Sequence, residues 1–237
     1  EFNGKKLKVR YFDQYGSEIS RPDYSVSTDV TAESVISNYI KSIGGAEKLN
    51  SISSIEVKAT ANLQGTVLEM YSLKNNQNQS LMTMTAMGMT LVKSVFNKYQ
   101  GYNEVNGQRV PLTDEELEQA IINSALFSEL NFDFETIELI GTSFVNDEKA
   151  YEIKITDNKS VFYSAETGLK LKEFESQEVD GNLITGEVFY KEYKEVDGIL
   201  IPSEINQVSA SIPVPGGLTF KTSVIKLNVK TSDSDFN

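Results

Sequence analysis

The five methionines of the chain fall within one short stretch, and methionine suits sites that bind apolar molecules. They are Met70, Met82, Met84, Met87 and Met89. The side chain is flexible and polarizable, so it adapts to ligands of different shape. Alternate residues of a strand share a face, so Met82 and Met84 should lie together, with Met70 facing them from a neighbouring strand. The cluster predicts an apolar groove for a lipid or peptide, unless the methionines simply fill the core.

Carboxylates form two groups that could carry acid–base chemistry. The groups are Glu115, Glu116 and Glu118 on a predicted helix, and Glu173, Glu175 and Glu178 along one strand region. A glycosidase needs two carboxylates at a fixed separation across a cleft, which sequence spacing does not show. The first group already has a structural explanation, because acids stabilise a helix N-terminus. The second group has the pattern of a solvated strand face.

Histidine and cysteine are both absent from the sequence. Their absence excludes disulfides, cysteine nucleophiles, Ser-His-Asp triads and histidine-containing zinc sites. Asp233 and Asp235 could contact calcium, but the glycine and distal glutamate of an EF-hand loop are missing. We therefore expect no catalytic residue, no metal and no cofactor. The formal net charge of −12 argues against nucleic acid as a partner, because no basic stripe is present to neutralise phosphates.

One amphipathic helix is predicted within residues 30–53, and it would have to lie on a sheet. Its apolar residues recur at helical spacing, namely Val35, Ile36, Tyr39, Ile40 and Ile43. Thr31 is the expected N-cap, because its hydroxyl can accept a bond from a first-turn amide. Gly44 or Gly45 can adopt the left-handed conformation that ends a helix.

Most of the remaining sequence predicts antiparallel strands. Residues 55–63 alternate between apolar and polar side chains, which is typical of a strand with one buried face. Asn106-Gly107 predicts a tight hairpin, and Asp197-Gly198 marks a similar turn between two later strands. Thr113 with Glu116 forms a capping box that starts a second helix. Short turns between consecutive strands favour an antiparallel meander over a parallel sheet.

The sequence divides into a lead-in, one domain and a tail. Residues 1–27 contain a short strand and the linker Arg21-Pro22-Asp23, and we interpret them as the remnant of a preceding domain or, alternatively, as an added edge strand. Residues 28–230 show no long linker and are expected to fold as a single domain. Residues 231–237 are polar and are expected to be a flexible tail. No apolar run approaches the roughly 20 residues that a membrane-spanning helix needs.

Four short motifs give the chain a resemblance to a known family. They are residues 39–49 (YIKSIGGAEKL), 125–130 (ALFSEL), 166–169 (ETGL) and 193–199 (YKEVDGI). In this order they resemble a Bacteroidetes domain that follows insulinase-like (pitrilysin-type) zinc peptidase domains or stands alone as an outer-membrane lipoprotein-sorting-like protein. Residues 9–16 (VRYFDQYG) resemble the end of the peptidase part. The resemblance covers essentially the whole chain.

The resemblance implies an α+β fold similar to the Lol-type carriers: a curved antiparallel half-barrel with helices packed on its concave face. Such carriers hold acyl chains between sheet and helix. The family's zinc motif belongs to the peptidase domain, so no catalytic residue carries over to this chain. The first helix then becomes a lid whose Val35, Tyr39 and Ile43 either plug the concave face or share it with a ligand.

We therefore predict a non-catalytic accessory or binding domain with an apolar groove between sheet and helix. The candidate groove residues are Met70, Met82, Met84, Met87, Met89, Val35, Tyr39 and Ile43. The expected partners are a lipid, lipoprotein or apolar peptide, and a peptidase domain in cis or in trans. The alternative is a structural domain with a filled core that positions a neighbouring peptidase domain. The lack of cysteine fits an exported protein, periplasmic or associated with the outer membrane.

Overall fold

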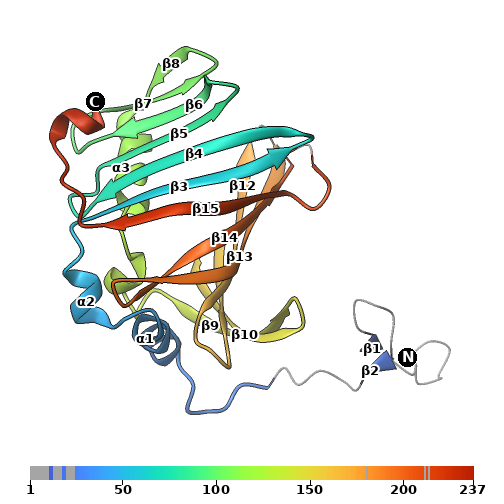
Figure 1. Ribbon diagram of the computed structural model, residues 1–237. Coiled ribbons are helices and arrows are strands. Elements are labelled where there is room, and N and C mark those ends of the chain that lie inside the picture. Colours follow the sequence, from blue (N-terminus) through green and yellow to red (C-terminus); the bar gives the residue numbers. More distant parts are fainter. Residues whose placement is uncertain (1–10, 13–17, 20–24, 180, 211, 213) are drawn as a thin grey trace.

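The computed structural model describes residues 11–12, 18–19, 25–179, 181–210, 212 and 214–237. Figure 1 shows one large curved sheet with the first two helices at one end. The helical elements are α1 (Ala32–Ser42), α2 (Ala46–Asn50), α3 (Asp114–Asn123) and the 3₁₀ turns η1 (Ser128–Asn131) and η2 (Asp233–Phe236). The short strands β1 (Tyr11–Phe12) and β2 (Glu18–Ile19) pair with each other. Most of the predicted lead-in strand and the linker at 21–23 lie outside the described residues.

The main sheet contains thirteen strands of the described residues, all antiparallel, in the order β8-β7-β6-β5-β4-β3-β15-β14-β13-β12-β11-β10-β9. The strands are β3 (Ser54–Leu63), β4 (Thr66–Asn75), β5 (Ser80–Ala86), β6 (Met89–Phe96), β7 (Gly101–Val105), β8 (Gln108–Pro111), β9 (Glu138–Val145), β10 (Glu148–Thr156), β11 (Lys159–Ser164), β12 (Lys170–Val179), β13 (Asn182–Val196), β14 (Ile199–Ser209) and β15 (Leu218–Leu227). Two meanders, β3 to β8 and β9 to β15, join where β3 pairs with β15. The predicted antiparallel meander is confirmed.

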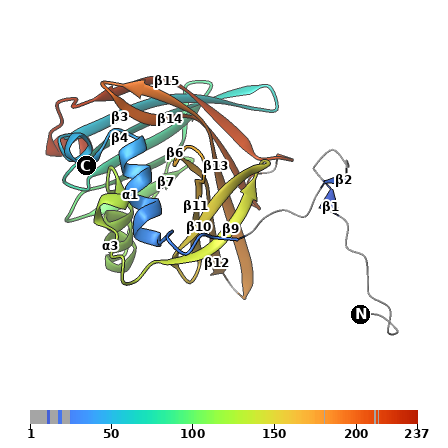
Figure 2. The same ribbon diagram turned by 90° about the horizontal axis from the view of Figure 1, so that it is seen from below.

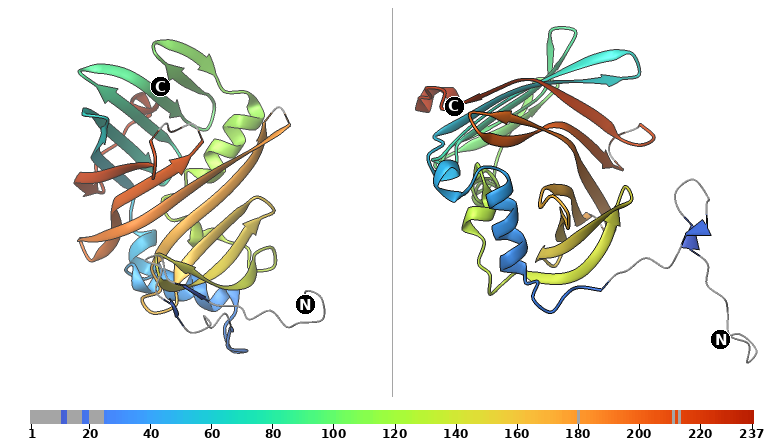
Figure 3. Two further views of the ribbon diagram at one scale, coloured as in Figure 1. Left: turned by 90° about the vertical axis from the view of Figure 1, so that its right-hand side faces the viewer. Right: turned by 60° about the horizontal axis from the view of Figure 1, so that its bottom comes forward.

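The connection from β8 to β9 carries α3 and η1 across the open side of the sheet. Figures 2 and 3 show α1 and α3 within the curve of the sheet. The half-barrel is therefore open between β8 and β9, the two edge strands, and the helical connection crosses that opening.

Turn residues set the register of the hairpins. Asn106 and Gly107 both have positive φ, 50° and 80°, and Val105 pairs with Gln108 beside them. This backbone twist matches the twist of the flanking strands, so the turn directs β7 and β8 into pairing. Asp197 and Gly198 repeat the pattern between β13 and β14, with φ of 50° and 73°. The hairpin predicted at Asn106-Gly107 is confirmed.

Helix α1 begins at the predicted cap. The Ser34 amide donates to Thr31 Oγ1 at 3.1 Å, and the Thr31 amide donates to Ser34 Oγ at 2.9 Å. These reciprocal bonds satisfy amides that would otherwise lack partners at the helix start. Val35, Ile36 and Tyr39 are buried on one face, as the periodicity predicts.

The double glycine after α1 docks the helix onto the sheet. The Ile43 carbonyl accepts a hydrogen bond of 3.0 Å from the Leu200 amide at the start of β14. Gly44 has a φ of +135°, and a Cβ there would lie 3.0 Å from the Gly198 carbonyl oxygen. A side chain would therefore meet both strain and a steric clash at this position.

The main core lies between the helices and one end of the sheet. It contains α1 and α2 residues together with Ile153, Val161, Tyr163, Ile199 and Ile201 from β10, β11 and β14. Helix α3 is different, because none of its residues is buried. The expectation of helices packed on the concave face is thus confirmed for α1 and only in part for α3.

The C-terminal segment packs on the convex face. Phe236 of η2 is buried against Leu73 and Val95. The residues on either side of these two in their strands point to the concave side, so Leu73 and Val95 face outward. Asn97 Nδ2 donates to the Phe236 carbonyl at 3.0 Å. This arrangement differs from the flexible tail that the polar composition predicted, because one aromatic side chain buries enough apolar surface to hold the segment.

Candidate functional site

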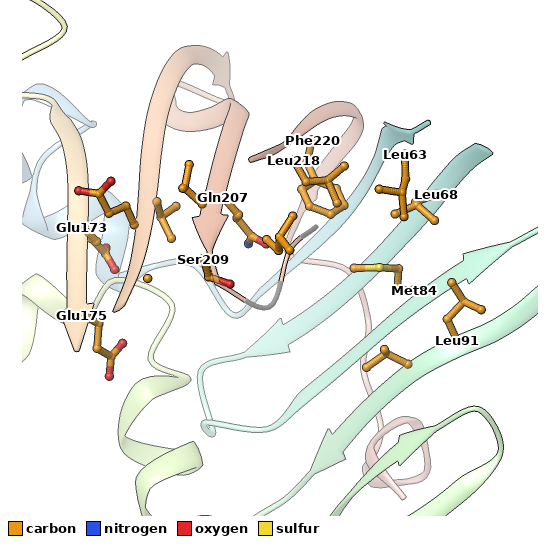
Figure 4. Close-up of a pocket in the computed structure, with 16 residues that line it drawn as sticks. Leu63, Leu68, Met84, Leu91, Glu173, Glu175, Gln207, Ser209, Leu218 and Phe220 are labelled. Atoms are coloured by element: carbon orange, nitrogen blue, oxygen red, sulfur yellow. The ribbon is translucent and has the colours of Figure 1, made fainter. Parts of the chain in front are cut away.

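A cavity of about 600 Å³ lies between two walls of the half-barrel. Figure 4 shows its lining, with β3 to β6 and β15 on one side and β12 to β14 on the other. Helix α1 packs at the start of β14, whereas the cavity uses Gln207 and Ser209 at the end of that strand. The cavity therefore occupies the end of the half-barrel away from α1. Its volume is within the range of pockets that bind small molecules, about 300–1,000 Å³.

One wall of the cavity is apolar. Its side chains come from five neighbouring strands and include Leu63, Leu68, Met84, Leu91 and Phe220. Leu68 faces the concave side between Ala61 of β3 and Ala86 of β5, its partners across the ladder. These alanines fill little space beside the larger side chains, and such alternation of sizes shapes the interior of a curved sheet. Strand alternation thus places an apolar surface on the inside.

The opposite wall carries the polar groups of the cavity, together with Val188 and Val208. Glu173 and Glu175 of β12 lie across the cavity from the leucines, and Gln207 and Ser209 of β14 lie beside them (Figure 4). Gly186 of β13 pairs with both Glu175 and Ser209. A Cβ at Gly186 would meet no atom within 4 Å, so this strand leaves the wall open at its centre.

A buried network of charged and hydroxyl groups lies between the cavity and the main core. Lys170 Nζ lies 2.6 Å from Glu129 Oε1 and 2.8 Å from Glu173 Oε1. The Tyr163 hydroxyl donates to Glu129 Oε1 at 3.2 Å, and the Tyr190 hydroxyl donates to Glu173 Oε1 at 2.9 Å. Tyr163 belongs to the main core, while Glu173 lines the cavity. We call these five residues the charged floor.

The surroundings fix the protonation state of three groups in the charged floor, Glu173, Lys170 and Tyr163, around neutral pH. Burial would raise the pKa of Glu173, but Lys170 and Lys159 lower it to about 2. Burial would likewise lower the pKa of Lys170, but Glu129 raises it well above its usual value. Burial raises the pKa of Tyr163, so this hydroxyl stays protonated and can donate. The floor is thus a fixed ionic arrangement at neutral pH.

The structure separates the five methionines. Met84 lines the cavity, and Met70 packs in the same apolar cluster, opposite Met84 in the β4–β5 ladder. Met82 shares the inner face but does not line the cavity. Met87 and Met89 lie at the β5–β6 turn and are 80% and 64% exposed. The five methionines are close in sequence but do not form one cluster, because Met87 and Met89 lie at the end of the β5–β6 hairpin and are exposed there.

The three helix candidates fill the core. Val35, Tyr39 and Ile43 are buried in the main cluster, and the rings of Tyr39 and Tyr163 lie 5.1 Å apart. None of the three lines the cavity at the far end of the half-barrel. The expected groove between helix and sheet is instead occupied by these side chains, and the space lies between the two walls of the sheet.

Several residues of this site had no signal in the sequence. From the sequence alone, Lys170 and Glu129 cannot be distinguished from exposed charged residues, because no sequence motif relates a residue of η1 to a residue of β12. Glu173 and Glu175 appeared to be a solvated strand face, but the curvature of the sheet turns that face inward. Glu116 has the structural role that was predicted: its Oε2 accepts from the Thr113 amide at 2.8 Å.

An open antiparallel half-barrel with a cavity between its walls defines the class of fold. No family model matches the sequence, and no curated protein matches it significantly. A LolA superfamily protein from Nitrosomonas europaea is similar, with a TM-score of 0.54 and 15% identity, covering 88% of this chain and 98% of that chain. A DUF1329 family protein from Desulfovibrio piger has a TM-score of 0.54 and 13% identity, covering 86% and 96%. At such identities the likeness establishes the fold alone, a LolA-type half-barrel.

Nothing in these comparisons links the chain to insulinase-like zinc peptidases. The motifs that carried that resemblance meet in one place, the junction of α1 with the sheet. Ser42 Oγ donates to the Thr167 carbonyl at 3.0 Å, and Lys48 Nζ donates to the Gly198 carbonyl at 3.3 Å. Glu129 of the second motif accepts a hydrogen bond from the Tyr163 hydroxyl in the same core. The motifs are therefore explained by packing of the fold, without a peptidase.

None of the helices in the described part of the chain has the length and apolarity needed to cross a lipid bilayer. The described residues also contain no cluster of three acidic side chains placed to hold a metal ion.

Proposed function

We propose that this protein is an exported, non-catalytic binding protein that holds an apolar chain, such as that of a lipid or lipoprotein, in the cavity of the half-barrel. The observation that supports it is the cavity of about 600 Å³ with a continuous apolar wall. Each methylene moved from water into such a site contributes about 0.8 kcal/mol. A chain of several methylenes along Leu63, Leu68 and Met84 would therefore be bound with useful affinity.

The open space above the charged floor supports a carrier in preference to a structural domain with a filled core. The side chains around α1 fill their end of the half-barrel, whereas the far end keeps its space above Glu173. A purely structural domain has no need of this space, because empty apolar volume lowers stability. An apolar peptide is the competing ligand, and a peptidase domain as partner stays a prediction based on the sequence resemblance.

Ligand occupancy can be tested directly on the purified protein. Native mass spectrometry and solvent extraction should reveal a bound amphiphile, and a fluorescent fatty acid should bind to the delipidated protein. A peptide mass in place of a lipid mass would favour the competing ligand. A protein that carries no ligand and binds no fluorescent fatty acid would contradict the proposal.

Two variants locate the binding. Met84→Trp places a large side chain in the cavity and should weaken binding of the fluorescent fatty acid about tenfold or more. Met89→Trp is the matched control, because Met89 is exposed at the start of the next strand, β6. Equal binding by both variants would show that the ligand lies elsewhere.

A further inference from the structure

Lys74 lies on the concave face of β4, in the same row as the apolar wall. Residues alternate along the strand, so Leu68, Met70, Ser72 and Lys74 share one face. Leu68 lines the cavity, and Met70 belongs to the apolar cluster around it. Lys74 is at the other end of this row, about 20 Å along the strand from Leu68. The row therefore leads from the cavity toward Lys74.

The ammonium of Lys74 has no partner within the described part of the chain. Among the residues that the structure describes, no side-chain hydrogen bond and no ion pair within 4 Å involves Lys74. Burial lowers the pKa of Lys74, so the side chain is enclosed by protein. It nevertheless keeps part of its surface accessible. Its position on the concave face of β4, and its interaction with Glu173, which lines the cavity, place the ammonium on the inner side of the sheet.

The charges around Lys74 do not balance it. Apart from burial, three described residues influence the pKa of Lys74: Glu173 raises it, whereas Lys159 and Lys170 lower it. Glu173 is already engaged, since its carboxylate lies 2.8 Å from Lys170 Nζ and 3.6 Å from Lys159 Nζ. Lys170 in turn is shared with Glu129. Among the described residues of this cluster, three lysines thus meet two glutamates, and Lys74 is the cation that forms no ion pair.

The remaining acid on this wall does not remove the imbalance. Glu175 also lines the cavity, but it is exposed, so water screens its charge from Lys74. An unpaired cation in a poorly solvated interior is costly. An anion supplied by a ligand would offset that cost.

We propose that Lys74 binds the anionic group of the ligand, so that the cavity takes an amphiphile with an apolar chain and a single carboxylate or phosphate. The chain lies against Leu68 and Met84, and the anion lies at the inner end beside Lys74. This assignment rests on the proposed function, because it names the chemical class of ligand for the same cavity.

The test compares ligands that differ only in charge. Calorimetry measures binding of oleate, oleyl alcohol, oleyl phosphate and inorganic phosphate to the delipidated protein. Oleate should bind about tenfold or more tightly than oleyl alcohol, because an ion pair in a poorly solvated site is strong. Oleyl phosphate should behave as oleate does. Inorganic phosphate should bind far more weakly, and equal binding of the free anion would overturn the assignment to an amphiphile.

Variants then assign the effect to Lys74. Lys74→Gln should abolish the preference for oleate and leave oleyl alcohol unaffected, while Lys74→Arg should retain most of it. Lys58→Gln is the matched control, because Lys58 lies on the neighbouring strand β3 and is exposed on the outer face. Preference for oleate that survives in Lys74→Gln would overturn the inference.

Two further readouts separate the possible failures. If oleate and oleyl alcohol bind equally well to the natural protein, the role of Lys74 is wrong and the proposed function stands. If neither binds, the proposed function itself fails. A ligand-free Lys74→Gln protein should melt at the same temperature or higher, because an unpaired charge is removed. A lower melting temperature would show a structural role and overturn the assignment.

Discussion

The ammonium of Lys170 lies 2.6 Å from the carboxylate of Glu129, and the two side chains are only 11% and 4% exposed. Lys170 begins β12, whereas Glu129 belongs to η1 in the connection that crosses the open side of the half-barrel. The ion pair therefore ties this connection to the inside of the sheet. It also forms part of the floor beneath the cavity.

Removal of one charge from this pair should destabilise the protein strongly. Glu129→Gln would leave Lys170 with one buried carboxylate instead of two, and breaking a buried pair costs about 3 kcal/mol. Urea unfolding at neutral pH measures the change in the free energy of unfolding. Glu135→Gln, an exposed residue of the same connection, should change it by less than about 0.5 kcal/mol. Similar losses in both variants would contradict the role of the pair.

Acid should weaken the fold through Glu173. Burial opposes the shift, but Lys170 and Lys159 lower the pKa of Glu173 to about 2, below its usual 4.5. A carboxyl group with a lowered pKa in the folded state stabilises the protein above its unfolded pKa and loses that effect as the pH falls. The difference in unfolding free energy between the natural protein and Glu173→Gln should be about 3 kcal/mol at neutral pH. It should decline between about pH 5 and pH 2. Parallel pH profiles of the two proteins would contradict this.

Gly44 should tolerate substitution less well than its neighbour. Gly44→Ala would add a Cβ that lies 3.0 Å from the Gly198 carbonyl oxygen, on a backbone with φ of +135°. We expect a loss of about 2 kcal/mol or more in thermal or urea unfolding. Gly45→Ala is the control, because its φ is also positive but its Cβ would meet no atom within 4 Å. A loss for Gly45→Ala as large as that for Gly44→Ala would show that close packing at Gly44 is unimportant.

The C-terminal turn should contribute to stability. Phe236→Ala removes a buried ring from the cluster with Leu73 and Val95, and such changes cost about 3 kcal/mol. Phe134→Ala, at a partly exposed position, should cost about 1 kcal/mol or less. Denaturant unfolding measures both. An unchanged stability in Phe236→Ala would restore the view of this segment as a loose tail.

Local features of the fold could be predicted from neighbouring residues. The cap at Thr31, the apolar face of α1 and the turn at Asn106-Gly107 depend on interactions within a few positions. Alternation along β3 and short turns were enough to indicate an antiparallel meander. The pairing of β3 with β15, which joins the two meanders, is a contact between distant segments that no local pattern encodes.

The candidate site could be predicted only in part. Met84 was proposed from its type and strand parity, and it lines the cavity. Lys74, Glu129 and Lys170 were not proposed, because a charged residue in a strand or turn usually faces water. Their burial follows from the curvature of the sheet and from the crossing connection. Because of the same curvature, the cavity lies at the end of the half-barrel away from α1, and not beside α1 as expected.

The sequence by itself determined which segments become strands and helices, where they turn, and that histidine and cysteine chemistry is excluded. Only the tertiary structure decided which face of β12 is enclosed, which methionine meets a cavity, and which cation lacks a counter-charge. The physical reason is the separation along the chain of the residues that interact. Periodicity, caps and turns depend on residues a few positions apart, whereas burial and charge balance depend on side chains brought together from distant strands.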